Sequence, residues 1–229
     1  MTLVLVAHGT RDPAGAHTIS ELAALVAARL PVEVRVAYAD VRSPDVTTVL
    51  SEVDGPAVVV PAFLSSGYHV RVDVPAQVAR SGRDAVVTPA FGPAPELVSA
   101  AHSRLVSAGW RRGDQVVLAA AGSSDPRALA DVEQAAGILS GLVGTRVRIG
   151  YATASPRIDE VVASARGRVA VASWLLAPGL FHRAAAASGA AVVADPIGAH
   201  PAVADLVVAR YREALRSAAR ISLAGSPSW

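Results

Sequence analysis

The chain contains one pattern twice, and this duplication constrains its fold more than any other feature. An apolar run that ends in glycine and Asp-Pro occurs as VLVAHGTRDP at residues 4–13 and as VLAAAGSSDP at residues 117–126. The copies differ at one chemically important position, because Ala121 stands where the first copy has His8. This difference predicts a single active site, made mainly by the first copy and closed by the second.

Three further landmarks recur in the same order, which chance in an Ala- and Val-rich chain does not explain. They are Tyr-Ala followed by Ser-Pro (38–44 and 151–156), an apolar run (58–64 and 169–175) and Gly-x-x-Pro (92–95 and 198–201). In a chain of 229 residues, the repeats predict two domains of similar size. We expect domains at residues 1–111 and 112–221, followed by a flexible Gly/Ser/Pro tail at residues 222–229.

Short Val-rich runs alternate along the chain with Ala-rich stretches of helical periodicity. The runs predict strands at residues 2–7, 32–38, 57–61, 85–87, 115–120, 147–151, 169–172 and 191–193. Helices are expected between the strands, among them 14–30, 44–53, 72–81 and 95–108, and a last helix at 201 to about 219. Continuous apolar strands that alternate with helices are typical of parallel sheets covered on both faces. Each half is therefore expected to be an α/β domain with a mainly four-stranded parallel sheet.

Composition and missing motifs exclude several classes of protein. All 21 basic residues are Arg, the net charge is +2 and there is no basic run, so we expect no nucleic-acid partner. No P-loop or Gly-x-Gly-x-x-Gly motif is present, which argues against nucleotide binding. The absence of cysteine excludes thiolate metal sites and cysteine nucleophiles. Without a signal peptide or a bilayer-length apolar run, a cytoplasmic enzyme with no membrane partner is expected.

Two histidines follow strands that a doubly wound sheet brings to one edge. His8 comes directly after the first predicted strand, and His69 lies in the loop after the third. Ligands of such sheets bind at the carboxyl ends of the strands, so the two loops can meet. Imidazole is a ligand for divalent iron, cobalt, nickel and zinc, and also a base near neutral pH. A single histidine at a strand end is often structural, but the pair predicts a metal-binding and catalytic site.

Several polar residues beside these histidines are candidate substrate-binding residues: Thr10, Arg11, Ser65, Ser66, Gly67 and Arg71. Guanidinium pairs well with carboxylates, so both arginines can hold an acidic substrate; the alternative is a solvated surface arginine. Thr10 and Asp12 can instead cap the helix that follows Pro13. Because Asp-Pro persists in the second copy without the histidine, a capping role is favoured for Asp12 and Asp125.

Glu96 and His182 are weaker candidates for the same site. Glu96 follows the fourth predicted strand, where it can reach the edge of the sheet as a third polar group. As an acid in the first turn of a helix, it is equally explained by the helix dipole. His182 lies near the second copy's version of the His69 loop, but an additional residue there leaves its alignment with His69 open.

The motifs together resemble the class II chelatases, and specifically the sirohydrochlorin chelatase family. The resemblance covers nearly the whole chain and rests on AHGTRDP (7–13), PAFLSSGYHVRVDVP (61–75), GPAP (92–95) and LAPG (176–179). It implies two tandem chelatase-like domains of flavodoxin-like topology. It also implies a lyase that inserts a divalent metal into sirohydrochlorin without nucleotide, on the route to siroheme or cobalamin. The histidines matching His8 and His69 are the family's metal-binding and catalytic pair.

The identity of the metal and of the reaction partner stays open at this point. The resemblance implies no permanently bound cofactor, with Fe²⁺, Co²⁺ or Ni²⁺ as a substrate beside a small tetrapyrrole. The apolar residues Phe63, Leu64, Trp174 and Leu175 are expected to face the tetrapyrrole ring. Alternatives are a chelatase for another tetrapyrrole or for nickel, and a non-catalytic tetrapyrrole or metal carrier. The fused copies predict a monomer, although a dimer is also compatible with the sequence.

Overall fold

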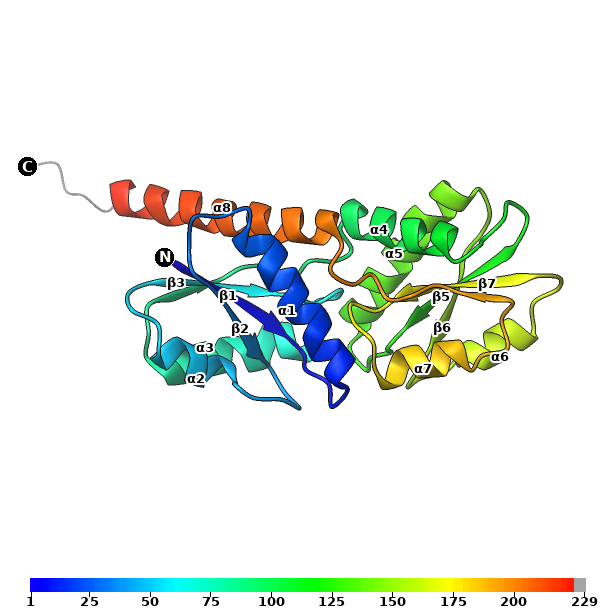
Figure 1. The fold of residues 1–229 in the computed structure, drawn as a ribbon, viewed down its shortest axis with the longest axis horizontal. Coiled ribbons are helices and arrows are strands. Elements are labelled where there is room, and N and C mark those ends of the chain that lie inside the picture. The colour runs from blue at the N-terminus through cyan, green and yellow to red at the C-terminus, as the bar shows by residue number, and fades with distance from the viewer. Residues whose placement is uncertain (225–229) are drawn as a thin grey trace, which may run out of the picture.

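Two four-stranded parallel sheets, one from each copy, form the centre of the computed structural model, which describes residues 1–224 (Figure 1). The first sheet has the order β2-β1-β3-β4, from β1 (Thr2–Ala7), β2 (Val34–Tyr38), β3 (Ala57–Pro61) and β4 (Ala85–Val87). The second has the order β6-β5-β7-β8, from β5 (Gln115–Ala120), β6 (Arg148–Tyr151), β7 (Val169–Trp174) and β8 (Val192–Val193). The identical order confirms the duplication and the predicted α/β fold.

The central strands are the most apolar ones, as the predicted coverage on both faces requires. Every residue of β1, β3 and β7 is buried. In the first sheet, the chain passes from β1 to β2 on one side and then back to β3 on the other side of β1. The second sheet repeats this path with β5, β6 and β7. The point of reversal lies between β1 and β3 in the first sheet and between β5 and β7 in the second. Ligands of open α/β sheets bind at the carboxyl ends of the strands at such points.

Helices connect the strands and cover both sheets. They are α1 (Pro13–Ala27), α2 (Val46–Ser51), α3 (Val74–Ser81), α4 (Pro95–Ser107), α5 (Pro126–Val143), α6 (Ile158–Ala163), α7 (Leu180–Ala186) and α8 (Pro201–Ala224). The capping role predicted for the two Asp-Pro pairs is confirmed. Asp12 Oδ1 accepts a hydrogen bond from Ala14 N at the start of α1, and Asp125 Oδ1 accepts one from Arg127 N at the start of α5.

The last helix of each copy packs against the sheet of the other copy. The helix α4 packs against β7 and α5, whereas α8 packs against β3 and α1. In Figure 1, α8 (orange to red) lies beside α1 along the half of the molecule that holds β1 to β3. One continuous cluster of buried side chains consequently includes Leu3 and Leu5 of the first sheet as well as Leu118 and Trp174 of the second. The two halves share a hydrophobic core.

The helices expected at 14–30, 44–53 and 95–108 are found within three residues at each end, whereas two others differ from the expectation in helix type or in length. The helix expected at 72–81 is preceded by a π-helical turn, His69–Asp73, and α3 starts only at Val74. The last helix, expected to end at about 219, continues to Ala224. The predicted flexible tail at 222–229 therefore begins with helical residues, and its remainder, 225–229, lies outside the described residues. No helix within residues 1–224 combines the length and the apolar character needed to cross a membrane.

Candidate functional site

A cavity of about 810 Å³ lies where the carboxyl ends of the central strands of both sheets face each other. The first copy lines it with the loops after β1 and β3, and the second copy with the loops after β5 and β7. These are the loops at the two points of chain reversal. A cavity of several hundred Å³ is typical of small-molecule sites. One chain thus supplies both walls of a site that neither copy could form alone.

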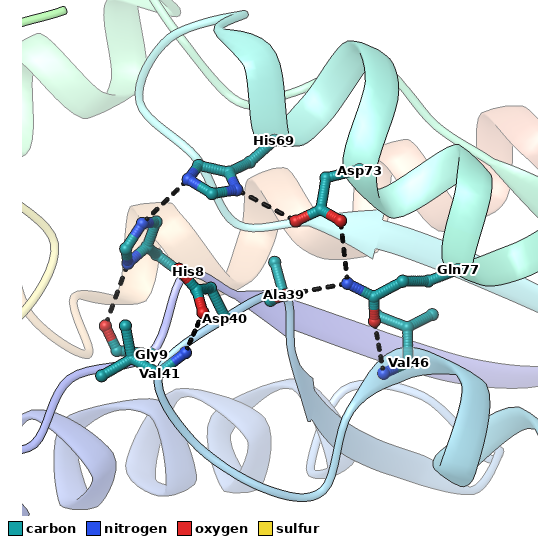
Figure 2. A network of polar contacts seen from close by, with 9 residues as sticks. All are labelled: His8, Gly9, Ala39, Asp40, Val41, Val46, His69, Asp73 and Gln77. Atoms are coloured by element: carbon teal, nitrogen blue, oxygen red, sulfur yellow. Dashed lines mark hydrogen bonds and ion pairs between the residues drawn. The ribbon is translucent and has the colours of Figure 1, made fainter.

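His8 and His69 meet at this cavity and both line it. His8 is the first residue after β1, and His69 is the first residue of the π-helical turn that precedes α3. Their Nε2 atoms are 3.1 Å apart, and their rings are nearly perpendicular at 86° (Figure 2). The sequence-based expectation that the two loops come together therefore holds in the structure.

The opposite nitrogen of each ring faces a hydrogen-bond acceptor. His8 Nδ1 lies 3.1 Å from the carbonyl oxygen of Gly9, and His69 Nδ1 lies 3.1 Å from Oδ2 of Asp73. Because a carbonyl and a carboxylate only accept, these contacts favour the Nδ1–H tautomer of both rings. The two Nε2 lone pairs then point at each other. Such an arrangement is favourable when a cation, a proton or a metal ion, is shared between them.

Asp40 supplies a third group that can bind a metal ion. One nitrogen or oxygen atom each of His8, Asp40 and His69 lies within 4.8 Å of the other two. Asp40 follows β2, the strand beside β1, and its backbone N–H donates to the carbonyl oxygen of His8 at 3.0 Å. Its Oδ1 accepts a hydrogen bond from Val41 N at 2.6 Å. Two imidazoles and a carboxylate suit divalent transition metals.

The spacing of the two Nε2 atoms fits a metal ion bound to both. Metal–imidazole bonds are about 2.1 Å long. With the Nε2 atoms 3.1 Å apart, such bonds would subtend about 95° at the metal ion. This is close to the right angle between neighbouring ligands in octahedral coordination. Such a geometry would leave coordination positions for further ligands.

The structure separates the remaining predicted site residues into two groups. Those that line the cavity are Thr10, Arg11, Ser65, Gly67 and His182. Among the described residues that do not line it are Ser66, Arg71 and Glu96. The backbone N–H of Ser66 donates to Asp131 Oδ2 at 2.7 Å. Glu96 is exposed in the first turn of α4, where the helix dipole accounts for it.

His182 lines the cavity without joining the histidine pair. Its Nε2 lies 3.3 Å from the carbonyl oxygen of Ala194, so this nitrogen can donate to the backbone of the second copy. It follows Phe181 in the first turn of α7, whereas His69 belongs to a π-helical turn. The two histidines therefore stand on different backbone structures and are not equivalent positions of the repeat.

Two reciprocal ion pairs connect the copies beside the cavity. Arg71 of the first copy pairs with Asp125 of the second at 3.2 Å. Arg183 of the second copy pairs with Asp12 of the first at 2.7 Å. Each aspartate therefore caps a helix with one oxygen and binds the opposite copy with the other. Arg71 is thus engaged by the protein itself, which differs from the role in substrate binding expected from the sequence.

Aromatic and aliphatic side chains form the apolar part of the wall. Phe63, Leu64, Trp174 and Leu175 all line the cavity, two from each copy at matching positions of the repeat. The ring of Phe63 stacks on His69 with an angle of 26° between the planes, and it meets His8 edge-on. An apolar wall beside a cluster of nitrogen and oxygen ligands suits a metal-binding ligand with a flat apolar face.

Comparison with known proteins identifies chains of the same kind. The model of the CbiX family matches residues 2–108 and again residues 115–214. A sirohydrochlorin cobaltochelatase from Methanococcoides burtonii is 32% identical over 78 residues, a match that covers 32% of this chain and 60% of that protein. The chain therefore spans less than two thirds of that relative's length.

Solved structures share the complete fold. SirB from Bacillus subtilis with Fe³⁺ superposes with a TM-score of 0.78 at 22% identity, covering 93% of this chain and 94% of that one. The cobalt complex of the sirohydrochlorin chelatase SirB from Bacillus subtilis subspecies spizizenii gives 0.77 at 22% identity and the same coverage. CbiX, described as the terminal enzyme for biosynthesis of siroheme in denitrifying bacteria, gives 0.75 at 23% identity, covering 93% and 99%. These likenesses establish the fold.

Proposed function

The chain belongs to the CbiX family, and from this premise we propose that it is a sirohydrochlorin chelatase. The proposed reaction inserts a divalent metal, Fe²⁺ or Co²⁺, into sirohydrochlorin without nucleotide, for siroheme or cobalamin. The observation that carries the proposal is the pair of imidazole nitrogens 3.1 Å apart, with Asp40 beside them, at a cavity built by both copies. The similar proteins support it, since they include a sirohydrochlorin cobaltochelatase and SirB complexes with iron and with cobalt.

The proposed chemistry needs three operations, and the site has groups for each. The apolar wall holds the flat face of the macrocycle. His8, His69 and Asp40 bind the metal ion and present it to that face. Insertion replaces two pyrrole N–H bonds by metal–nitrogen bonds and releases two protons. An imidazole that gives up the metal regains a free Nε2 lone pair, which can accept one of these protons.

The polar residues of the cavity supply recognition of the substrate's carboxylates. Arg11 is exposed at the cavity, and no ion pair holds it among the described residues. We assign it the binding of a carboxylate, with Thr10, Ser65 and the backbone of Gly67 as further hydrogen-bonding groups. Since both walls belong to one chain, the proposed active unit is a monomer.

Anaerobic absorbance spectroscopy of sirohydrochlorin with Co²⁺ or Fe²⁺ tests the function. We expect wild type to accelerate metallation over the uncatalysed rate. Loss of a general base alone costs about 10²–10⁴-fold, so His8→Ala and His69→Ala should each lose at least about 100-fold. The variant His17→Ala is the matched control, because His17 lies on the exposed side of α1, paired with Glu21.

The outcomes separate the enzyme from a carrier. Tight binding of sirohydrochlorin without faster metallation by either metal would contradict the chelatase and leave the carrier. Retention of activity in both cavity variants would contradict the assigned roles of the two histidines. A higher rate with one metal would narrow the pathway, because iron leads to siroheme and cobalt to cobalamin.

A further inference from the structure

A chain of polar contacts runs from the half-buried His69 away from the cavity, through Asp73 to the buried Gln77. We propose that Asp73 and Gln77 are positioning residues that hold the His69 ring and the Asp40 loop in the geometry required for metal loading. The inference rests on the proposed function, and it concerns residues that do not line the cavity themselves. Figure 2 shows the contacts.

The spacing of the three residues places them in one row along the helix. His69, Asp73 and Gln77 follow one another at intervals of four residues, from the π-helical turn into α3. Side chains at this spacing are neighbours on a helix surface. The row therefore extends from the cavity into the interior of the first copy.

Asp73 stands where an aspartate ordinarily caps a helix, yet its side chain makes no capping hydrogen bond. Its two oxygens are used in another way. Oδ2 lies 3.1 Å from Nδ1 of His69, and Oδ1 accepts a hydrogen bond from Nε2 of Gln77 at 3.3 Å. A carboxylate behind a metal-binding imidazole fixes the ring's orientation and tautomer and makes Nε2 a stronger donor to the metal.

Gln77 is only 4% exposed, and each polar atom of its side chain has a partner. Nε2 donates to the carbonyl oxygen of Ala39 at 2.8 Å and to Asp73, while Oε1 accepts from Val46 N at 3.1 Å. A buried amide is costly unless it is satisfied in this way. Gln77 thereby joins α3 to the loop after β2 and to the start of α2.

The contact with Ala39 connects the two sides of the metal cluster. Ala39 directly precedes Asp40, whose backbone N–H is bonded to His8. Gln77 therefore holds the Asp40 loop on one side and, through Asp73, the His69 ring on the other. The second copy has no such row at its own histidine, because the residue four positions after His182 is Ala186. The row occurs in the copy that also has His8.

Direct binding of Co²⁺ in the absence of tetrapyrrole tests the inference without relying on turnover. Calorimetric titration would compare wild type with Asp73→Ala, Asp73→Asn, Gln77→Ala and the bulkier Gln77→Met. Loss of such an outer carboxylate typically weakens metal binding 10–100-fold, which we expect for Asp73→Ala. Asp73→Asn keeps an acceptor oxygen without the charge and should recover part of the loss.

A second readout reports the ring itself. Nitrogen-15 NMR of the histidine side chains in the metal-free protein should show His69 as the Nδ1–H tautomer in wild type and a mixture in Asp73→Ala. Glu21→Gln is the matched control, because His17 and Glu21 form an exposed His–acid pair at the same spacing of four residues, 3.4 Å apart. It should leave Co²⁺ binding unchanged. Thermal unfolding checks that each variant folds, and Gln77→Met preserves packing if Gln77→Ala does not.

The outcomes distinguish this inference from the proposed function. If Asp73→Ala and Gln77→Met bind Co²⁺ within twofold of wild type and the His69 signals do not change, the positioning role is overturned, whatever the chelatase assay gives. If wild type binds Co²⁺ and the variants lose affinity while no metallation occurs, the positioning role stands and the chelatase falls. Failure of wild type to bind Co²⁺ without tetrapyrrole would overturn the role in metal loading, and the metallation assay would still decide the chelatase.

Discussion

Gly9 allows the loops that carry His8 and Asp40 to approach each other. Its φ is +97°, and a Cβ atom placed there would lie 2.2 Å from the carbonyl oxygen of Asp40. A side chain at this position would have to push the two loops apart. We expect Gly9→Ala to lower the free energy of unfolding by about 2–5 kcal/mol, combining left-handed strain with overpacking. Co²⁺ affinity should fall with it.

Gly55 provides the control for this prediction. Its φ is also positive, at +78°, but a Cβ atom there would meet no atom within 4 Å. Gly55→Ala therefore has the backbone strain alone, about 1–2 kcal/mol, and should keep Co²⁺ binding. Urea unfolding measures the loss of stability in both variants, and calorimetry measures their Co²⁺ affinity. Equal losses of stability, or normal Co²⁺ binding by Gly9→Ala, would mean that close approach of the loops is unimportant.

The candidate site was predictable from the sequence where its residues directly follow the two central strands. His8 and His69 were predicted in this way, and they meet in the structure. Asp40 was not predicted, although it too follows a strand, because a single aspartate in a loop has many ordinary roles. Arg71 was expected to bind substrate, and its ion pair with Asp125 of the other copy is a contact that the sequence alone cannot reveal.

At the scale of elements, the residue before α8 caps this helix with a side chain that can be protonated. His200 precedes Pro201, and its Nδ1 accepts a hydrogen bond from Ala202 N at 3.2 Å. Burial, and then the charge of Arg104, lower the pKa of His200 below its ordinary value. The neutral ring is therefore the form that the folded protein favours, and only this form can accept the bond.

The sign of the pH effect follows from this pKa shift. Above pH 6.5, His200 is neutral in both the folded and the unfolded chain and adds no pH dependence. Below that value the unfolded chain takes up the proton first, so stability falls until the lower pKa of the folded state is passed. Asn is a good capping residue that does not titrate. We expect the free energy of unfolding to drop less between pH 7 and pH 5 in His200→Asn than in wild type. Equal drops in urea titrations would refute this.

Element boundaries were predictable where composition changes sharply and not where helix geometry is irregular. The alternation of apolar runs predicted all eight strands within a few residues. The π-helical turn at His69–Asp73 was not predicted, because its sequence differs little from that of an α-helix. This turn places His69 and Asp73 four residues apart in contact, which is the arrangement that the site uses.

At the scale of the molecule, the sequence repeats and the packed layers of the structure do not share the same boundary. The repeat predicts a boundary between residues 111 and 112, and the family model also matches on either side of it. Yet α4 covers the second sheet and α8 the first. The apolar stripe of a helix is the same whichever sheet it covers, so this exchange could not be predicted from the pattern of either helix.

The exchange leads to a prediction about which fragment folds alone. A fragment of residues 93–200 contains the second sheet together with α4, whereas residues 112–229 contain the same sheet without α4 and with α8 separated from β3. In α4, Leu97 and Leu105 are fully buried. Burial of a leucine contributes about 1.5–3 kcal/mol, so these two together approach the total stability of a small domain, about 5 kcal/mol at its lower limit.

We therefore expect residues 93–200 to unfold cooperatively on heating, and residues 112–229, of similar length, to lack such a transition and to bind a hydrophobic dye. Circular dichroism and dye fluorescence of the two purified fragments make the comparison. Adding residues 1–111 should restore a cooperative transition to 112–229, because it returns α4 to the second sheet and gives α8 the first sheet to cover. A more stable 112–229 fragment would mean that each repeat is its own folding unit and that the exchanged helices contribute little.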